Sequence, residues 1–327
     1  MKKLILSMAA ATMLLSCQND DSAKQQTTTD ASGAGMSAKR SCASTEVLLR
    51  QLQEDPSLAA KMNQIEDFTQ NFIQKQENAP AFSRLVNGKI ELPVVVNVLY
   101  RTAAENISLA QIQSQIDILN KDFNALNADF ATSNPFNAVK ANIGVTFVLD
   151  QVIRKATNKT SWGTNDAMKK ASGGGLAAVS PTTKLNLWVC TIGGGILGYA
   201  QFPGGSSSTD GVAIDSKYIG TSGTANYPYN LGRTATHEVG HWMNLRHIWG
   251  DATCGSDLVS DTPTHNGPNY GVPAAGHRST CSGTPLEMYM NYMDYTDDRG
   301  MYMFSNGQKA RVDAVFAVGG SRASFRL

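Results

Sequence analysis

The chain of 327 residues is long enough for two average domains or for one large domain with appendages, and its composition favours the second. Lysine and arginine together number 28 and aspartate and glutamate 27, so there is no basic surplus to attract nucleic acid and we expect no nucleic-acid partner. After the first residues, no apolar run approaches the roughly 20 residues that a membrane helix needs, so we expect membrane contact only through a lipid.

The first segment, MKKLILSMAAATMLLSC, has two lysines, an apolar stretch too short to span a membrane comfortably, and then Leu14-Leu15-Ser16-Cys17. It resembles a bacterial lipoprotein signal, in which residues 1–16 are removed and Cys17 carries the lipid. The alternative is an ordinary secretory signal with an incidental cysteine. In both cases the protein leaves the cytoplasm, and we expect an outer-membrane or cell-surface precursor whose mature domain is secreted.

Two kinds of segment follow the signal. Residues 17–43 are rich in Ser, Thr, Gln, Asp and Gly, have little to bury, and are predicted to form a flexible tether. Residues 44–77 have apolar side chains near helical spacing with a break at Pro56, which predicts two short helices. Pro80 and Gly88 then mark an exposed, cleavable connection. The apolar positions are Val47, Leu48, Leu52, Leu58, Met62, Ile65, Phe68 and Phe72.

The rest of the chain has the pattern of one α+β (α/β-like mixed) domain. Ser108 and Gln111 form a predicted capping box at the start of a long helix, and Ser305 and Gln308 cap a last helix. Apolar runs between these helices predict strands at residues 91–100, 145–150, 185–189, 196–203 and 211–215. This order gives a mixed sheet with two main helices, followed by a mostly irregular C-terminal lobe.

Three of the five histidines lie within the segment HEVGHWMNLRH, residues 237–247. His237 and His241 are four apart and therefore lie on one face of a helix, where they can hold one metal ion. Glu238 is placed to hold a metal-bound water. His247 can reach the same ion only if the helix stops, and Asn244 tolerates the left-handed backbone that such a break needs.

This segment resembles the metzincin signature H-E-x-x-H-x-x-G-x-x-H, with Asn244 in place of the glycine. The segment NYMDYTDD supplies the methionine turn that metzincins need, with Met293 beneath the metal. Together with GRTATHEVGHW, VSDTP and MFSNGQ, it resembles the pappalysin (cytophagalysin) group from about Leu92 to the C-terminus. The resemblance implies a zincin-like domain with a twisted mixed sheet, a backing helix, an active-site helix and an edge strand that can hold an extended peptide.

The resemblance also implies an activity. Zn²⁺ bound by His237, His241 and His247 keeps one open position for water, and Glu238 acts as the general base that activates this zinc-bound water to hydrolyse a peptide bond. Tyr295 matches a tyrosine that hydrogen-bonds the tetrahedral intermediate, or else it is a core tyrosine. We therefore expect a helical propeptide at 44–83 and a catalytic domain at 84–327.

The five cysteines have different predicted fates. The resemblance implies a disulfide between Cys254 and Cys281, and the positions of a second family bridge are occupied here by Val272 and Gly300. Cys190, in the apolar run LNLWVC, is predicted to be a buried free thiol. Cys42, in KRSCAST, resembles a cysteine switch that keeps a precursor latent by binding the zinc, although it could be a stray cysteine of the tether.

The C-terminal half holds three further predicted features. Asp257, Asp261 and Thr262 have the oxygen types and spacing that suit Ca²⁺, which the family binds in this loop, although a capped turn is the alternative. His265 and His277 lie in a Gly/Pro/Asn-rich loop and are predicted to be surface side chains.

Asp298 resembles the acidic residue of pappalysins that cut before arginine or lysine. Alternatively, Asp298 faces solvent or supports the turn, and Asp297 or neither residue matters.

The sequence therefore predicts a secreted, lipid-tethered zinc endopeptidase precursor that acts as a monomer on peptide or protein substrates. One alternative is a non-catalytic surface adhesin on a metzincin scaffold, against which the intact Glu238 argues, because a binding protein needs no base. Another is a narrow enzyme that processes a single partner protein.

Overall fold

The computed structural model describes residues 39–77 and 90–325. The predicted lipid site Cys17 and the predicted connection at 80–89 lie outside the described residues. Within these ranges, no helix is both long enough and apolar enough to cross a membrane.

A five-stranded sheet forms the centre of the domain, in the order β3-β1-β4-β6-β5. The first four strands run parallel, and β5 pairs antiparallel with β6 at the edge. The strands are β3 (Val145–Ala156), β1 (Ile90–Tyr100), β4 (Leu185–Cys190), β6 (Val212–Asp215) and β5 (Gly198–Ala200). A second, two-stranded sheet pairs β2 (Lys140–Ala141) with β7 (Phe304–Ser305). The fold is thus mixed α/β with a mostly parallel sheet.

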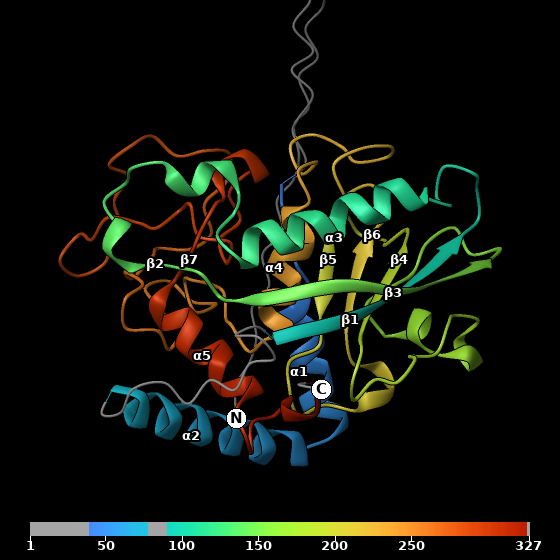
Figure 1. The fold of residues 1–327 in the computed structure, drawn as a ribbon, viewed down its shortest axis with the longest axis horizontal. Helices are drawn as coiled ribbons and strands as arrows, with labels where there is room; N and C mark the ends of the chain where they lie inside the picture. The colour runs from blue at the N-terminus through green and yellow to red at the C-terminus, as the bar shows by residue number, and fades with distance from the viewer. Residues whose placement is uncertain (1–38, 78–89, 326–327) are drawn as a thin grey trace, which may run out of the picture. The chain divides into compact units, whose positions relative to one another are not determined.

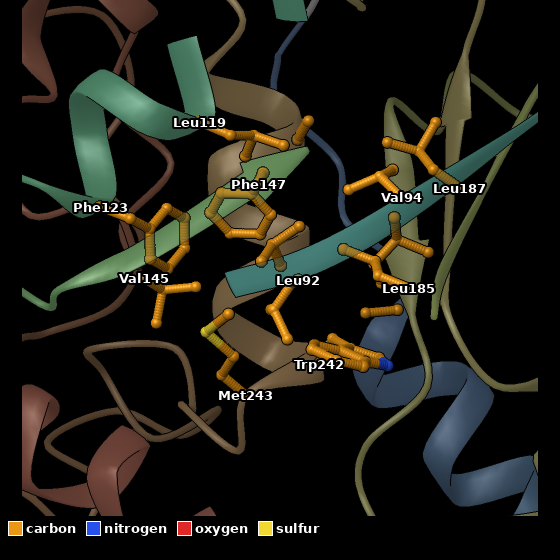
Figure 2. Close-up of a cluster of buried hydrophobic side chains, with 14 of the residues drawn as sticks. Leu92, Val94, Leu119, Phe123, Val145, Phe147, Leu185, Leu187, Trp242 and Met243 are labelled. Atoms are coloured by element: carbon orange, nitrogen blue, oxygen red, sulfur yellow. The ribbon is translucent and has the colours of Figure 1, made fainter. Parts of the chain in front are cut away.

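One face of the main sheet packs on two helices, α3 (Leu109–Phe123) and α4 (Arg233–Trp242). The alternate residues of β1 point to this face, and Figure 2 shows how they meet apolar side chains of α3, β3, β4 and α4 in one buried cluster. Because strand side chains alternate, the remaining residues face the other way. On that second face lies a smaller cluster that includes Trp188, Tyr199 and Val47.

The first two helices, α1 (Ser44–Glu54) and α2 (Ser57–Glu77), confirm the predicted pair with its break at Pro56. Val47 of α1 is buried in the cluster on the second face of the sheet. The helix α2 lies beside α5 (Asn306–Phe316), as Figure 1 shows in blue and red at the bottom of the view. Glu66 of α2 forms a two-armed ion pair with the buried Arg311 of α5, at 2.8 and 2.7 Å.

The structure differs from the predicted elements in three places. The strand β3 continues to Ala156, and β5 has only the three residues Gly198–Ala200. Ser108 caps α3 by accepting from the Gln111 N–H, but the Gln111 side chain donates to Ile219 and Thr224, so the capping box is incomplete. At Ser305 both halves of the capping box are present. Short 3-10 turns lie at Ala128–Ala131, Asn137–Val139, Ala167–Lys169, Ala171–Gly173, Ser207–Thr209, Asp298–Gly300 and Ala323–Phe325.

Candidate active site

The helix α4 ends where the histidine spacing requires it to end. Asn244 has the left-handed φ of 68°, and the Leu245 N–H donates back to the Gly240 carbonyl over 3.0 Å. This tight turn brings His247 back beside the helix. The His241 Nε2 atom lies 3.1 Å from the His237 Nε2 atom and 3.0 Å from the His247 Nε2 atom. Asn244 therefore performs the function of the signature glycine.

The other ring nitrogen of each histidine has its own acceptor. The Nδ1 atoms of His237, His241 and His247 lie 2.7 Å from the Tyr292 carbonyl, 2.8 Å from the Leu245 carbonyl and 2.6 Å from Asp251 Oδ1. An acceptor at Nδ1 places the proton there and leaves the Nε2 lone pair free, as in the outer sphere of zinc sites. The Nε2 lone pairs of all three rings are thus available for one metal ion.

The separations between these Nε2 atoms fit a zinc ion. Ligand atoms about 2.0–2.1 Å from a tetrahedral zinc are roughly 3.3 Å apart, close to the 3.0 and 3.1 Å found here. Burial and the neighbouring imidazoles lower the pKa of His237 well below its usual value. Burial and His247 lower the pKa of His241 to about 3. Both rings are therefore neutral at physiological pH, the form that binds metal.

The residues beneath and beside the three rings are closely packed. A Cβ on Gly240 would lie 2.4 Å from the Met293 sulfur, so a larger residue at position 240 would force the Met293 side chain to move. The Met293 carbonyl accepts from the N–H of Ile248, which follows the third histidine. Burial raises the pKa of Glu238 to about 7. The candidate ligands and Met293 are buried, and Tyr295 is nearly so.

The segment before α1 lies in the cleft against the edge strand. Cys42 bridges Gly198 of β5 in a parallel arrangement, and the Ala43 N–H donates to the Gly198 carbonyl over 3.1 Å. The Cys42 sulfur lies 3.2 Å from Glu238 Oε2 and belongs with the three histidines to one group whose ligand atoms are all within 4.8 Å of one another. Tyr295 contacts the backbone of Cys42, donating to its carbonyl over 3.2 Å.

Arg40, two residues before Cys42, reaches Asp298. Its guanidinium donates to Asp298 Oδ1 over 2.5 Å and lies 4.7 Å from the ring centre of Tyr229. The second Asp298 oxygen accepts from the N–H groups of Leu231 and Arg233. Asp298 is therefore buried and does not face solvent. Arg40 is a site residue that the sequence pattern did not reveal, because its partner Asp298 lies 258 positions away.

Comparisons with known proteins agree with this geometry. Residues 186–317 match the peptidase M43 family, described as pregnancy-associated plasma protein-A. Extracellular metalloprotease 1 of Coccidioides posadasii is 33% identical over 238 residues, which cover 69% of this chain and 78% of that protein. The chain belongs to peptidase family M43. An extracellular metalloprotease of Pyricularia oryzae is 36% identical over 233 residues, covering 68% of this chain and 72% of that one.

Two solved structures are similar to most of this chain. Mature mirolysin of Tannerella forsythia with a cleaved peptide has a TM-score of 0.71 and 41% identity, covering 73% of this chain and 96% of that chain. A promirolysin mutant from the same organism has a TM-score of 0.76 and 38% identity, covering 88% of this chain and 97% of that one. The M43 protein is accordingly a metzincin metalloprotease, an enzyme with a catalytic zinc rather than an adhesin.

Three cysteines of this M43 domain are in their predicted states. Cys254 and Cys281 form a disulfide with a Cα–Cα distance of 5.7 Å, and Cys190 is a buried free thiol. A Cβ on Gly300 would lie 3.1 Å from a Val272 methyl, so the positions predicted to have held a second bridge are neighbours in space.

The predicted surface position of His265 is wrong. It is fully buried, whereas the exposed His277 lies at the surface as predicted. The Met288 N–H donates to His265 Nε2 over 2.9 Å, and Nδ1 faces Asp294 at 3.5 Å. The loop has a polar composition, but it covers the His265 side chain. The Cys254 N–H also donates to the His265 carbonyl, which ties the backbone at His265 to the disulfide.

Proposed function

We propose that this metalloprotease is an endopeptidase that holds zinc through His237, His241 and His247 and uses Glu238 as its general base. The observation that carries the proposal is the convergence of three free Nε2 lone pairs beside a buried carboxylate. When bound, zinc polarises the scissile carbonyl and lowers the pKa of water. The Glu238 carboxylate takes the proton from the attacking water and later passes it to the leaving amine.

The edge strand and Tyr295 have positioning roles in this proposal. The strand β5 offers unpaired backbone groups to an extended peptide, as it does to Cys42 and Ala43. The Tyr295 hydroxyl contacts the backbone of the chain that lies in the cleft, which supports a hydrogen bond to the substrate carbonyl as the reaction proceeds.

We propose that the enzyme cuts before arginine or lysine. The Asp298 carboxylate already binds a guanidinium, that of Arg40, in a buried pocket floored by Tyr229. An apolar side chain in that pocket would leave the carboxylate oxygen without a partner at roughly 1–3 kcal/mol. The pocket therefore selects a base in the residue after the cut.

We also propose that residues 44–83 are a propeptide and that Cys42 keeps the precursor latent. The Cys42 sulfur lies where a fourth ligand would bind and also contacts Glu238, so it blocks both metal and base. Self-cleavage between Ser83 and Arg84 would agree with the proposed preference for a basic residue after the cut. It would make Arg84 the new N-terminus. If Cys17 carries lipid, this cut releases a monomeric domain from the membrane. N-terminal sequencing and membrane fractionation test these steps.

Calcium at Asp257, Asp261 and Thr262 stays a prediction. The Thr262 hydroxyl lies 2.9 Å from each Asp257 oxygen, and Asp261 accepts from Ser305 and Gly307 at the start of α5. These bonds support the capped-turn alternative. Thermal unfolding of calcium-depleted, zinc-loaded protein with and without added calcium distinguishes the two, because only a calcium site would raise the melting temperature.

The experiment that tests the proposed function compares two variants of the full chain. Glu238→Ala should keep its zinc and lose proteolysis, because the base is not a ligand. His241→Ala should lose both. A Glu238→Ala protein that cleaves peptides at the wild-type rate would refute the mechanism. Mass spectrometry of peptide-library and casein products separates a broad endopeptidase from an enzyme with one partner substrate.

A further inference from the structure

A second carboxylate of the catalytic domain is bound to the propeptide at a distance from Asp298. Asp166, in the connection between β3 and β4, has a side chain only 3% exposed. Its Oδ1 atom accepts from Lys169 at 3.0 Å and from the Tyr199 hydroxyl at 3.1 Å. Its Oδ2 atom accepts from Arg50 of α1 at 2.6 Å. Among the described residues, the bonds of Oδ1 come from Lys169 and Tyr199 of the catalytic domain, whereas that of Oδ2 comes from Arg50 of α1.

The place that Arg50 occupies is a built site for a guanidinium. The same Nη2 atom that reaches Asp166 also donates to the Thr164 carbonyl over 3.2 Å. Two acceptors from one loop thus converge on the cation, while the Arg50 side chain remains 26% exposed. When the propeptide leaves, the domain loses the cation but keeps both acceptors, and Lys169 and Tyr199 still hold the carboxylate in position.

This site adjoins the substrate cleft through β5. Tyr199 lies between Gly198, which pairs with Cys42, and Ala200, whose N–H donates to the Ser44 hydroxyl over 2.8 Å. Val47 of α1 packs in the same cluster as Tyr199 and Met168. The propeptide therefore covers Asp166 and an apolar surface next to it, and both face solvent once α1 is removed.

The order of contacts along the segment from Arg40 into α1 indicates which substrate residues Asp166 would contact. Arg40 lies in the pocket proposed for the residue after the cut, Cys42 lies at the histidines, and α1 begins immediately beyond them. Along this segment, the contact with Asp166 therefore lies on the other side of Cys42 from the contact with Asp298. A substrate places there the residues that precede the cut.

We propose that Asp166 is a second specificity carboxylate, which binds an arginine side chain of the substrate on the side before the cut after Arg50 has left. The proposal rests on the proposed function, because it needs the propeptide to leave and the substrate to lie along β5. The charged pair would form in a partly dry site, where such hydrogen bonds are strong and a neutral side chain forms none of them.

The test uses the full chain, produced as precursor and allowed to activate. Quenched fluorescent peptides carry arginine after the cut and either arginine or its neutral isostere citrulline at one of the four preceding positions. We expect wild-type kcat/KM to be about tenfold higher with arginine at one of these positions. Asp166→Asn should reduce that ratio to about one.

Two further variants keep the test decisive. Asp166→Asn leaves the buried Lys169 without its partner and could unfold the domain, so the double variant Asp166→Leu/Lys169→Met removes both charges together. Asp117→Asn, an exposed aspartate of α3, is the matched control and should keep the arginine ratio.

The results separate this inference from the proposed function. Cleavage that depends on Glu238 but shows no arginine preference before the cut, or a preference that survives in both Asp166 variants, overturns the Asp166 assignment alone. Failure of the wild-type enzyme to cleave any peptide overturns both.

Discussion

Arg40 and Asp298 form an ion pair across 2.5 Å in which the side chains are 1% and 0% exposed. The other Asp298 oxygen is held by the N–H groups of Leu231 and Arg233 at the start of α4. The carboxylate is therefore held by the backbone at the start of α4, and under the proposed function the oxygen that binds Arg40 becomes available when the segment before α1 leaves.

Asp298→Asn should remove the preference for a basic residue after the cut. We expect kcat/KM for a peptide with arginine at that position to fall about a hundredfold, because a neutral amide loses the charge-assisted pair. Zinc content and cleavage of neutral peptides should stay near wild type. Asp297→Asn is the matched control. Wild-type products that begin mainly with Leu, Ile or Phe would contradict the assignment.

Arg40→Gln should shorten the latency of the precursor. The variant loses the buried ion pair and the contact with Tyr229, so the segment in the cleft is held less firmly. We expect maturation about tenfold faster, measured by gel analysis of purified precursor over time. Lys39→Gln, which changes the neighbouring lysine, should mature at the wild-type rate. Equal maturation rates in wild type, Arg40→Gln and Lys39→Gln would show that Arg40 does not maintain latency.

Cys42→Ala should give early activity or faster self-processing, because the sulfur no longer blocks the metal site and Glu238. Cys190→Ala removes the second free thiol of the described residues, which is buried in the cluster with Trp188 and Tyr199, and should leave latency intact. Precursor activity on a fluorescent peptide, read in the first minutes after purification, checks both. Unchanged latency in Cys42→Ala would show that the cysteine is incidental.

Glu66→Gln should loosen α2 from the catalytic domain. The variant keeps the shape of the side chain but removes the charge that faces the buried Arg311, and the precursor should lose about 1–3 kcal/mol of unfolding free energy. Glu54→Gln breaks an exposed pair with Arg50 on α1 and should change stability by less than about 0.5 kcal/mol. Urea unfolding of the two precursors measures the difference, and equal losses would argue against a special role for Glu66.

His265 should make the domain sensitive to acid. Burial lowers its pKa to about 4, against about 6.5 in an unfolded chain, so the unfolded state binds the extra proton first as pH falls. Stability contributed by the neutral ring is present above pH 6.5 and is lost towards pH 4, by up to about 3 kcal/mol. The charged or titratable groups facing it are Glu287, Asp294 and His277.

His265→Gln should flatten the decline of stability between pH 6.5 and 4, since the amide has no proton to gain. His277→Gln changes an exposed histidine of the same loop and should keep the decline, because the buried His265 ring remains. Asp294, whose pKa burial raises to about 7, is present in all three proteins. Denaturant unfolding at several pH values gives the three curves, and parallel curves for wild type and His265→Gln would refute the prediction.

The features predictable from the sequence are those encoded by neighbouring residues. The break at Pro56, the cap at Ser305 and the left-handed Asn244 each depend on a few adjacent positions, and the structure contains all three. The contacts Arg40–Asp298 and Arg50–Asp166 join residues more than a hundred positions apart, and no local pattern encodes such a pairing. The burial of His265 could not be predicted for the same reason. Loop composition does not reveal how the Cys254–Cys281 disulfide arranges the chain around this side chain.

The parallel pairing of Cys42 with β5 has a consequence for the polarity of the chain in the cleft. The propeptide enters at the Asp298 pocket and leaves toward α1, whereas a substrate with its post-cut residue in that pocket must run from the α1 side toward Asp298. Under the proposed function, the segment from Arg40 to Cys42 thus occupies the pocket for the post-cut residue with its amide groups reversed. It would then offer no correctly oriented peptide bond to Glu238, so it would inhibit without being consumed, and the cut that removes it would fall elsewhere in the chain.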